Sequence, residues 1–390
     1  MNQILNVVKN IFSKEHSGQV LGIDIGSSSI KIILLEKVAE KAVLRNYGEI
    51  ALGPRVGISV GQATNLPTEK LADALREILK ETTIIPHHTL IAIPFNASLL
   101  SIIELPTREK KDLVAMIPLE ARRYIPVPIT DVSLDWWILP PRKSEQKPEG
   151  ILHSYHTPKI LTDTIPFMSD QKTTGKTEVI IAAIHNEIIK KYEVIKNLVH
   201  IPTQSSHFEI EIFSTLRSVV GNDHSAIIVI DIGAGATKLI LIDEGVVRGS
   251  HIISIGGQDI TLAISRSKGI TFEEAEEKKC RIGLTGDEES RDILASAEIL
   301  IENIMSEAAR FIENYEKKYG AKIIKIILVG GGSRLGGLKE KVATQFPSVL
   351  IIQGDPFSRI NTPVFLTQTI KELSPNFAVA IGIALKGLEE

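Results

Sequence analysis

Two acidic residues in this sequence each stand at the end of an apolar run and directly before a turn of small residues. Asp24 is followed by Gly26 and a run of serines, and Asp231 is followed by Gly233 and Gly235. A turn of this kind directs backbone N–H groups toward one point, where an anion can bind. Because glycine and serine add little bulk, a phosphate can approach such a turn closely. These residues therefore predict phosphate binding beside a carboxylate.

The two segments are versions of one pattern, which indicates a duplicated architecture. Residues 22–35 and 229–242 each contain an apolar strand, an aspartate, a small-residue turn, a lysine and a second apolar run. We therefore expect two related halves that clamp one nucleotide between them. The predicted donors to its phosphates are backbone and hydroxyl groups of Gly26, Ser27, Ser28, Ser29, Gly233, Gly235 and Thr237.

Asp24 and Asp231 are also the predicted metal ligands. Two carboxylates beside a triphosphate repel it unless a divalent cation lies between them, so the pattern implies Mg²⁺, held largely through water. The alternative role for each aspartate is to cap its turn. Lys31 and Lys238 follow the turns, and strand alternation allows each to point inward or to solvent. For Lys31, which is flanked by isoleucines and leucines, the sequence slightly favours an interaction with a partner group over exposure to solvent.

A third glycine-rich element follows the apolar run 326–329. Gly330, Gly331 and Gly332 precede Ser333, and three adjacent glycines after a strand imply that the backbone passes close to a flat or charged group. In order and spacing, the three elements resemble the phosphate 1, phosphate 2 and adenosine motifs of the actin, heat-shock chaperone and sugar-kinase superfamily of ATP-binding proteins. The alternative is three unrelated glycine turns. The resemblance implies ATP and an α/β, actin-like (ribonuclease H-like) fold with duplicated domains around a nucleotide cleft.

The same resemblance assigns roles to further residues. Gly256 and Gly257 fit the superfamily's second turn near the nucleotide, and Glu276 with Lys279 matches a pair that contacts the ribose and adenine in relatives. Their i,i+3 spacing equally allows a solvated salt bridge. Glu211 is, by position, the candidate catalytic group that would align water with the γ-phosphate. Nothing in its local sequence marks it as a base, so ATP binding is better supported than turnover, and slow hydrolysis is left open.

The composition limits the class of protein. A chain of 390 residues can bury two or three cores, and a net charge of −3 gives no sign of a nucleic-acid-binding face. The single cysteine, Cys280, excludes an internal disulfide and fits a reducing cytoplasm. No apolar run is long enough to cross a bilayer. Residues 1–18 carry apolar side chains at helical spacing, which predicts a surface helix touching a membrane or partner, a short helix packed on the body, or a mobile tail.

The spacing of apolar residues predicts alternating helices and strands. Pro118 should bend or split the helix that contains it, and the polar, proline-rich stretch 140–177 is expected to be irregular. Helices are expected over 67–81, 108–125, 186–199, 272–280 and 289–319, after residue 259 and from residue 375, and strands over 20–35, 89–95, 99–105, 132–139, 179–184, 226–242 and 246–255.

Several segments resemble a narrower family, the PilM family of type IV pilus assembly proteins. They are residues 103–106, 120–126 and 131–136, the spacing of Glu211, Phe213 and Arg217, and the last apolar segment, 375–385. Two features depart from the family pattern: the long stretch 140–177 and Pro118.

This resemblance implies a small α+β unit of strand-helix-strand-strand type inserted into the first half. The implied boundaries are an N-terminal segment 1–18, a first half formed by 19–87, 201–222 and a returning helix in 366–390, an insertion in 88–200 with its irregular loop 140–177, and a second half in 223–365.

The function implied by the resemblance is a cytoplasmic, ATP-binding scaffold at the inner face of the membrane. Such a scaffold captures the short cytoplasmic tail of a PilN-like inner-membrane protein in a groove between the insertion and the first half. Tyr124, Ile125 and Trp136 are candidates for that neighbourhood, although each taken alone is better explained by core packing. Membrane contact would be indirect, nucleic-acid binding is not expected, and self-association is left open.

Two other functions stay open. One is an FtsA-like division protein, although relatives of that type usually carry a C-terminal amphipathic membrane helix and this chain stops shortly after Lys386. The other is a small-molecule kinase of the same superfamily, which would need a carboxylate base near the γ-phosphate on the substrate side, and the sequence indicates none.

Overall fold

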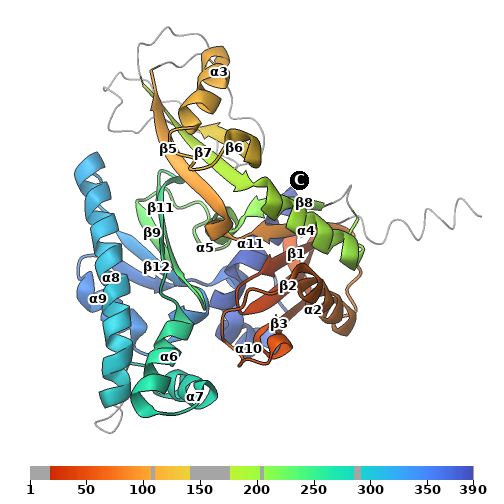
Figure 1. Ribbon diagram of the computed structural model, residues 1–390, viewed down its shortest axis with the longest axis vertical. Helices are drawn as coiled ribbons and strands as arrows, with labels where there is room; N and C mark the ends of the chain where they lie inside the picture. Colours follow the sequence, from red (N-terminus) through yellow and green to blue (C-terminus); the bar gives the residue numbers. More distant parts are fainter. Residues whose placement is uncertain (1–17, 107–109, 141–175, 203–205, 285–290, 390) are drawn as a thin grey trace, which may run out of the picture.

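A computed structural model describes residues 18–106, 110–140, 176–202, 206–284 and 291–389. Within these ranges the chain forms three sheets, arranged as two related halves and a smaller third unit (Figure 1). The predicted N-terminal helix and nearly all of the stretch 140–177 lie outside the described residues.

The first half is built on a five-stranded mixed sheet. Its central strand, β1 (Gln19–Ile25), is buried along almost its whole length, as expected for a strand that is covered on both faces. β1 pairs antiparallel with β2 (Ser29–Val38) and parallel with β4 (His88–Ile93). In spatial order the strands are β3 (Lys41–Ala51), β2 (Ser29–Val38), β1 (Gln19–Ile25), β4 (His88–Ile93) and β8 (Ser206–Ile210).

Helices cover both faces of this sheet. α2 (Thr68–Glu81) and α4 (Asn186–Val199) bury one face. α11 (Ala378–Glu389) buries the other, together with α10 (Thr367–Leu373), and packs against α5 (Glu211–Val219). The contact between α11 and α5 is so close that a Cβ on Gly382 would lie 1.7 Å from the Ser214 carbonyl oxygen, so only glycine fits there.

The second half repeats this topology. Its strands lie in the order β11 (Val246–Ile253), β10 (Thr237–Asp243), β9 (Ile227–Ile232), β12 (Lys325–Val329) and β13 (Leu350–Gln353). The central strand again pairs antiparallel with the next strand in the chain and parallel with a later one. The predicted duplication is confirmed. Helices α6 (Gly257–Lys268) and α8 (Arg291–Tyr319) cover one face, with α7 (Phe272–Ile282) and α9 (Leu338–Gln345) beside them.

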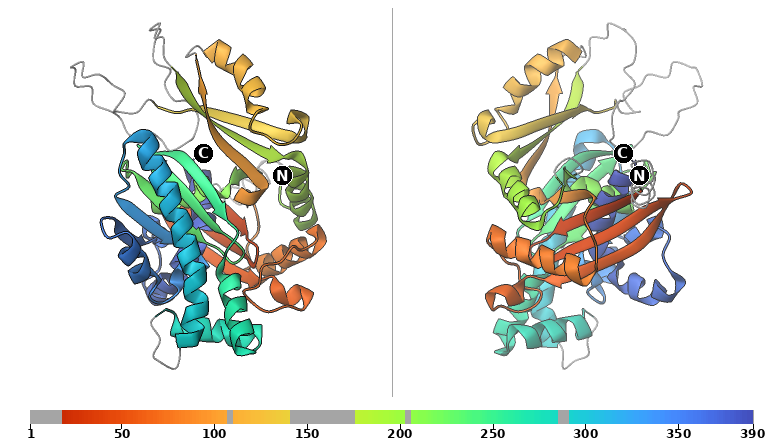
Figure 2. Two further views of the ribbon diagram at one scale, coloured as in Figure 1. Left: turned by 60° about the vertical axis from the view of Figure 1, so that its left-hand side comes forward. Right: turned by 90° about the vertical axis from the view of Figure 1, so that its right-hand side faces the viewer.

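The third unit is a three-stranded antiparallel sheet with one helix. Its strands lie in the order β5 (Ser98–Leu105), β7 (Thr177–His185) and β6 (Val132–Ile138), and α3 (Lys110–Ala121) packs on one face. Figure 2 shows this unit at the end of the molecule opposite α6 and α7. Its other face joins a core shared with α5 and the sheet of the second half. Pro118 lies within α3, which continues to Ala121, so the expected split is not observed.

The inserted unit is smaller than the predicted range 88–200. β4 pairs with β1 and β8 in the sheet of the first half, and α4 packs on α2, so both belong to the first half. The second half also ends earlier than residue 365. Phe357 and Ile360 pack into the core of the first half, because the chain at Asn361 hydrogen-bonds to the backbone of β3.

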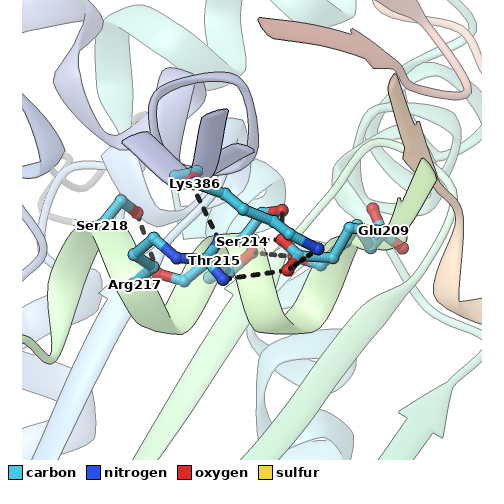
Figure 3. A network of polar contacts seen from close by, with 8 residues as sticks. Glu209, Ser214, Thr215, Arg217, Ser218 and Lys386 are labelled. Carbon is cyan, nitrogen blue, oxygen red and sulfur yellow. Dashed lines mark hydrogen bonds and ion pairs between the residues drawn. The ribbon is translucent and has the colours of Figure 1, made fainter. Parts of the chain in front are cut away.

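A buried ion pair joins three elements of the first half. Glu209 on β8 accepts hydrogen bonds from Arg217 on α5 at 2.8 and 2.9 Å, and from Ser214 at 2.5 Å (Figure 3). Lys386 on α11 lies 3.5 Å from the same carboxylate. Burial alone would raise the pKa of Glu209, but the hydrogen bonds and positive charge of Arg217, with smaller contributions from Lys386 and Ser214, hold that pKa below its usual value.

The variant Glu209→Gln should therefore destabilise the chain by roughly 3 kcal/mol at neutral pH, because it leaves the buried Arg217 cation uncompensated. Chemical denaturation checks this value. The folded carboxyl is a stronger acid than the unfolded one, so its contribution is present above the unfolded pKa and is lost as pH falls through the folded pKa. The double variant Glu209→Leu/Arg217→Met should recover most of the loss, and equal losses in both variants would contradict a charge-based explanation.

Candidate functional site

The two aspartate turns are built in the same way. The Gly26 N–H donates to the Ser29 carbonyl at 3.0 Å, and the Gly233 N–H donates to the Ala236 carbonyl at 2.9 Å. In each half the aspartate lies directly opposite the lysine that follows the turn, as the pairs Asp24–Lys31 and Asp231–Lys238.

The turns of the two halves face each other. A Cβ placed on Gly235 would lie 3.6 Å from the Ser27 hydroxyl oxygen and 3.1 Å from Ala63. Within the described residues, the backbone N–H groups of Ser27, Ser28, Ala234 and Gly235 make no backbone hydrogen bond. Two opposed turns with uncommitted N–H groups form a cradle suited to an anion.

Asp24 and Asp231 are both 7% exposed, but their surroundings differ. Among the described residues, no hydrogen bond or ion pair reaches the Asp24 carboxylate. Burial is the main cause that raises the pKa of Asp24 to about 6, with a contribution from the nearby Glu211 charge, and Lys31 opposes the shift. Asp231 instead accepts a hydrogen bond from Lys238 at 3.1 Å.

The two lysines, which the sequence allowed to point inward or to solvent, each have a partner inside the protein, as was favoured for Lys31. The Lys31 ammonium donates to the Ser29 hydroxyl at 2.8 Å and lies 3.5 Å from Glu49. The Lys238 ammonium lies 2.9 Å from Glu211 and 3.1 Å from Asp231. Burial opposes its charge, but the two carboxylates outweigh burial and raise the pKa of Lys238 above its usual value.

Glu211 is the first residue of α5 and is 6% exposed. One carboxylate oxygen accepts from the Phe95 N–H at 2.5 Å, and the other contacts Lys238. The same negative charges affect Tyr192. Burial is the main cause that raises the pKa of Tyr192, and the charges of Glu211 and Asp24 raise it further. The predicted catalytic glutamate thus lies in the same cluster as both aspartates.

The triple-glycine element borders Asp231. Gly330 has φ +81°, and a Cβ on it would lie 2.3 Å from a carboxylate oxygen of Asp231; a Cβ on Gly332 would lie 2.3 Å from the Ile232 side chain. These glycines are therefore required by packing against the second phosphate turn, whether or not a ligand is present. Ser333 points back into the turn, because its hydroxyl donates to the Gly330 carbonyl at 2.7 Å.

Gly256 and Gly257 place the start of α6 on the second phosphate turn. A Cβ on Gly256 would lie 2.3 Å from the Ala234 carbonyl oxygen, and the Gly257 N–H donates to the Gly233 carbonyl at 2.9 Å. Glu276 and Lys279 on α7 form the salt bridge that their spacing allows, at 2.7 Å.

Lys279 also donates to the Gly257 carbonyl at 3.1 Å. The Glu276–Lys279 pair therefore links α7 to the start of α6, beside the small-residue turn at Gly233. A solvated pair would make no such link between the two helices. A role for either residue toward a ribose or adenine stays a prediction.

Sequence reasoning missed the segment that crosses from the first half to the second. The Thr64 N–H donates to the Ser27 carbonyl at 2.7 Å, and the Ala63 N–H donates to the Gln258 side chain at 2.9 Å. Ser59 hydrogen-bonds to Glu273. A cavity of about 410 Å³ opens beside this crossing and is lined by Pro54, Ile58, Ser59, Val60, Glu273 and Glu276.

Sequence reasoning also missed Asn376. Its side-chain oxygen is buried without a hydrogen-bond partner in the described part of the chain, and it lies 3.6 Å from the Cβ position of Gly331. A buried polar atom without a partner is costly, and such atoms frequently await a ligand or water. The available signal was one asparagine in the apolar segment 375–385.

The donors present fit a magnesium–nucleotide complex. Asp24 and Asp231 provide carboxylate oxygens, and the facing turns provide N–H groups for phosphate. The described residues contain no group of three or more His, Cys, Asp or Glu side chains that could hold a metal ion by themselves. A cation here would therefore depend on phosphate and water for its remaining ligands, as is usual for Mg²⁺.

Two halves of identical topology, with a small-residue turn of each half facing the other, define the actin-like fold. MreB of Spiroplasma citri, solved with bound AMPPNP, has this fold, with a TM-score of 0.50 and 13% identity over 94% of this chain and 95% of that one. A solved PilM-PilN type IV pilus biogenesis complex is more similar, with a TM-score of 0.72 and 23% identity over 95% of this chain and 99% of that chain.

The chain belongs to the family described as type IV pilus assembly protein PilM, which matches residues 22–157 and 163–388. A curated relative, ethanolamine utilization protein EutJ of Escherichia coli (strain K12), is 29% identical over 123 residues. The match spans 32% of this chain and 40% of that relative's length. Among the helices of the described residues, none is long and apolar enough to cross a membrane.

The variant Asp24→Asn should stabilise the nucleotide-free protein at pH 7.5 by on the order of 2 kcal/mol, because it removes a buried charge. The folded pKa of Asp24, about 6, lies above the unfolded value of 3.8, so the destabilisation caused by this carboxylate grows as pH rises from about 4 to about 6 and is complete above pH 6. The difference between variant and parent should shrink as pH falls toward 4. Urea denaturation at both pH values checks this result.

The exposed carboxylate of Asp73, which pairs with Arg76, provides the control. Asp73→Asn should change stability by less than about 0.5 kcal/mol at either pH. An Asp24→Asn variant less stable than the parent at pH 7.5 would show that the carboxylate is stabilised by partners in the folded state.

Proposed function

We propose that this protein is a cytoplasmic, nucleotide-binding scaffold of the type IV pilus assembly machinery. In this proposal it binds ATP with Mg²⁺ between its halves and holds the cytoplasmic tail of a PilN-like inner-membrane protein. The observation that carries the proposal is the match to the PilM family over nearly the whole chain, together with an anion cradle where that family's fold leads us to expect one.

The roles of the site residues in this proposal follow from their contacts. The turns at Ser27 and Gly235 would bind the phosphates, and Gly331 with Asn376 would border the adenosine. Bound Mg²⁺ would neutralise phosphate charge next to Asp24 and Asp231. Asp24 would be held ionised by that cation, since burial alone makes its charge unfavourable.

Binding is better supported than catalysis. Glu211 is within reach of the phosphate region, but its carboxylate is already held by Lys238 and the Phe95 N–H. A group that positions water for phosphoryl transfer must direct a lone pair at that water, and the two contacts fix the orientation of the Glu211 carboxylate and offset its charge. We therefore assign the nucleotide a structural role, with hydrolysis slow.

The inserted unit is joined to the second half by a buried charge. The Arg248 guanidinium on β11 is fully buried, lies 2.7 Å from Glu178 on β7 and donates to the Pro140 carbonyl at 3.0 Å. Tyr319 on α8 approaches the same glutamate at 3.4 Å. A movement of the second half on nucleotide binding would therefore be transmitted to the inserted unit, and so to a tail bound between that unit and the first half.

The predicted groove residues differ in accessibility. Tyr124 is 42% exposed, whereas Ile125 is 5% exposed and packs in the core of the inserted unit beside Trp136. Of the three, Tyr124 is therefore the side chain available to a partner. The exposed apolar residues Val114 and Leu119 on α3 belong to the same unit.

Isothermal titration with Mg-ATP and a synthetic peptide of the PilN-like cytoplasmic tail tests the proposal. Wild-type protein should bind Mg-ATP and should bind the peptide more tightly when ATP is present. Asp24→Asn should weaken Mg-ATP binding at least about tenfold, since it removes one of the two carboxylates that would hold the cation, and should lower tail affinity to its nucleotide-free value. Wild-type protein that binds neither ligand would overturn the proposal.

Glu178→Gln tests the coupling itself. This variant should bind Mg-ATP as the wild type does but lose most of the ATP-dependent gain in tail affinity, because Arg248 loses its nearest ionised partner and is left with Glu244 of the second half, at 3.8 Å. Glu104 lies directly opposite Glu178 in the sheet and pairs with Lys176 at the surface, so Glu104→Gln is a matched control that should keep the gain. Equal behaviour of the two variants would contradict transmission through Arg248.

A further inference from the structure

In each half, a lysine lies opposite the aspartate of the central strand. The two halves differ in the residue that lies opposite this lysine on the other neighbouring strand. In the first half, Lys31 lies opposite Asp24 on β1 and opposite Glu49 on β3. Its ammonium goes to Glu49 and to the Ser29 hydroxyl. As a result, Lys31 leaves the Asp24 carboxylate without a hydrogen bond.

In the second half, the position equivalent to Glu49 is apolar. Lys238 lies opposite Asp231 on β9 and opposite Ile252 on β11. Because Ile252 offers no acceptor, the Lys238 ammonium turns to Asp231 at 3.1 Å and to Glu211 at 2.9 Å. Glu211 belongs to the first half, so this lysine is a cation that joins carboxylates of both halves.

Glu211 is thereby held at both oxygens, by the Phe95 N–H on one and by Lys238 on the other. Hydrolysis of a nucleoside triphosphate needs a group that orients water. The water oxygen forms a bond to the γ-phosphorus, the bond to the β–γ bridging oxygen breaks, the diphosphate leaves with that electron pair, and the water loses a proton to a base. A glutamate whose charge is already compensated accepts that proton poorly.

We propose that Lys238 restrains hydrolysis at this site by occupying Glu211 and Asp231, so that bound ATP is retained largely uncleaved. Lys238 is a positioning residue, since it acts through Glu211. The inference rests on the proposed nucleotide-binding function. It also implies that the second half carries its own counter-charge, whereas the Asp24 carboxylate of the first half has no hydrogen-bonded cation among the described residues.

Single-turnover cleavage of prebound, γ-labelled ATP tests the restraint. Lys238→Met should cleave at least about tenfold faster than wild type, equivalent to about 1.4 kcal/mol in activation free energy. Lys238→Arg, which keeps the charge, should stay near the wild-type rate. Lys325→Met is the matched control, because Lys325 pairs with Asp223 at the end of β12 away from Asp231. Its rate should equal that of wild type.

Divalent-cation binding by the nucleotide-free protein gives a readout independent of turnover. Without Lys238, the buried carboxylates Asp24, Glu211 and Asp231 would lack the cation that joins the halves. Mg²⁺ should then raise the melting temperature of Lys238→Met by ~3 °C or more relative to NaCl of equal ionic strength, and that of wild type by less than ~1 °C. A structural role alone would not produce this Mg²⁺ dependence.

If Lys238→Met does not fold, the double variant Lys238→Met/Glu211→Gln is used instead. It preserves the net charge of the cluster formed by Asp24, Glu211, Asp231 and Lys238. Chelation of Mg²⁺ should weaken its ATP binding more than that of wild type, because Asp231 then faces the phosphates uncompensated. An equal effect of chelation would overturn the inference, as would unchanged cleavage by a folded Lys238→Met. Wild-type protein that fails to bind Mg-ATP would instead overturn the proposed function.

Discussion

Negative charge buried at the joint between the two halves is the constraint on which the site depends. Asp24, Asp231 and Glu211 come from both halves and are each less than a tenth exposed. Removing carboxylates from water is expensive unless cations or hydrogen-bond donors replace the lost solvation. Lys238 provides part of that compensation, and in the proposed function a bound divalent cation would provide more.

The duplication explains why the site has two similar sides, and its imperfections explain why the sides act differently. Cross-strand register places a lysine opposite an aspartate in both halves. The residue opposite the lysine on its other neighbouring strand then determines which group the ammonium contacts. Glu49 accepts the ammonium of Lys31, whereas Ile252 has no acceptor, so Lys238 contacts Asp231 and Glu211 instead. The difference in one cross-strand neighbour therefore explains why Asp231 has a hydrogen-bonded cation and Asp24 has none among the described residues.

The repeated pattern in the sequence was sufficient to predict the fold and the convergence of its turns. Apolar runs at residues 22–35 and 229–242 became the central strands of equivalent sheets, and helices predicted over 67–81 and 186–199 are confirmed as α2 and α4. Such local signals survive because burial of a strand or a helix face depends on residues close in the chain. The family resemblance located the insertion in the first half.

Pairings between distant residues could not be read from the sequence. Strand β4 was assigned to the insertion, because its apolar run looks the same whichever sheet it joins. The ion pair of Lys238 with Glu211 depends on the direction of α5. The burial of the Asn376 side-chain oxygen depends on how the segment before α11 packs against the triple-glycine turn. The glycines themselves illustrate the difficulty, since Gly330 and Gly332 are required by Asp231 and Ile232 as much as by any nucleotide.

The distribution of contacts between the halves defines where they can separate. On the side of the inserted unit, α5, the insertion's sheet and the second sheet share one continuous apolar core, and the buried Arg248 pairs there with the partly buried Glu178. On the other side the halves meet through a few polar contacts of Ser59 and Ala63 with α6 and α7. Opening at the polar side exposes little apolar surface and is the cheaper movement. The apolar core is therefore the pivot, and the inserted unit packs on that same core, so in the proposed function a rotation of the second half would reach a partner through this unit.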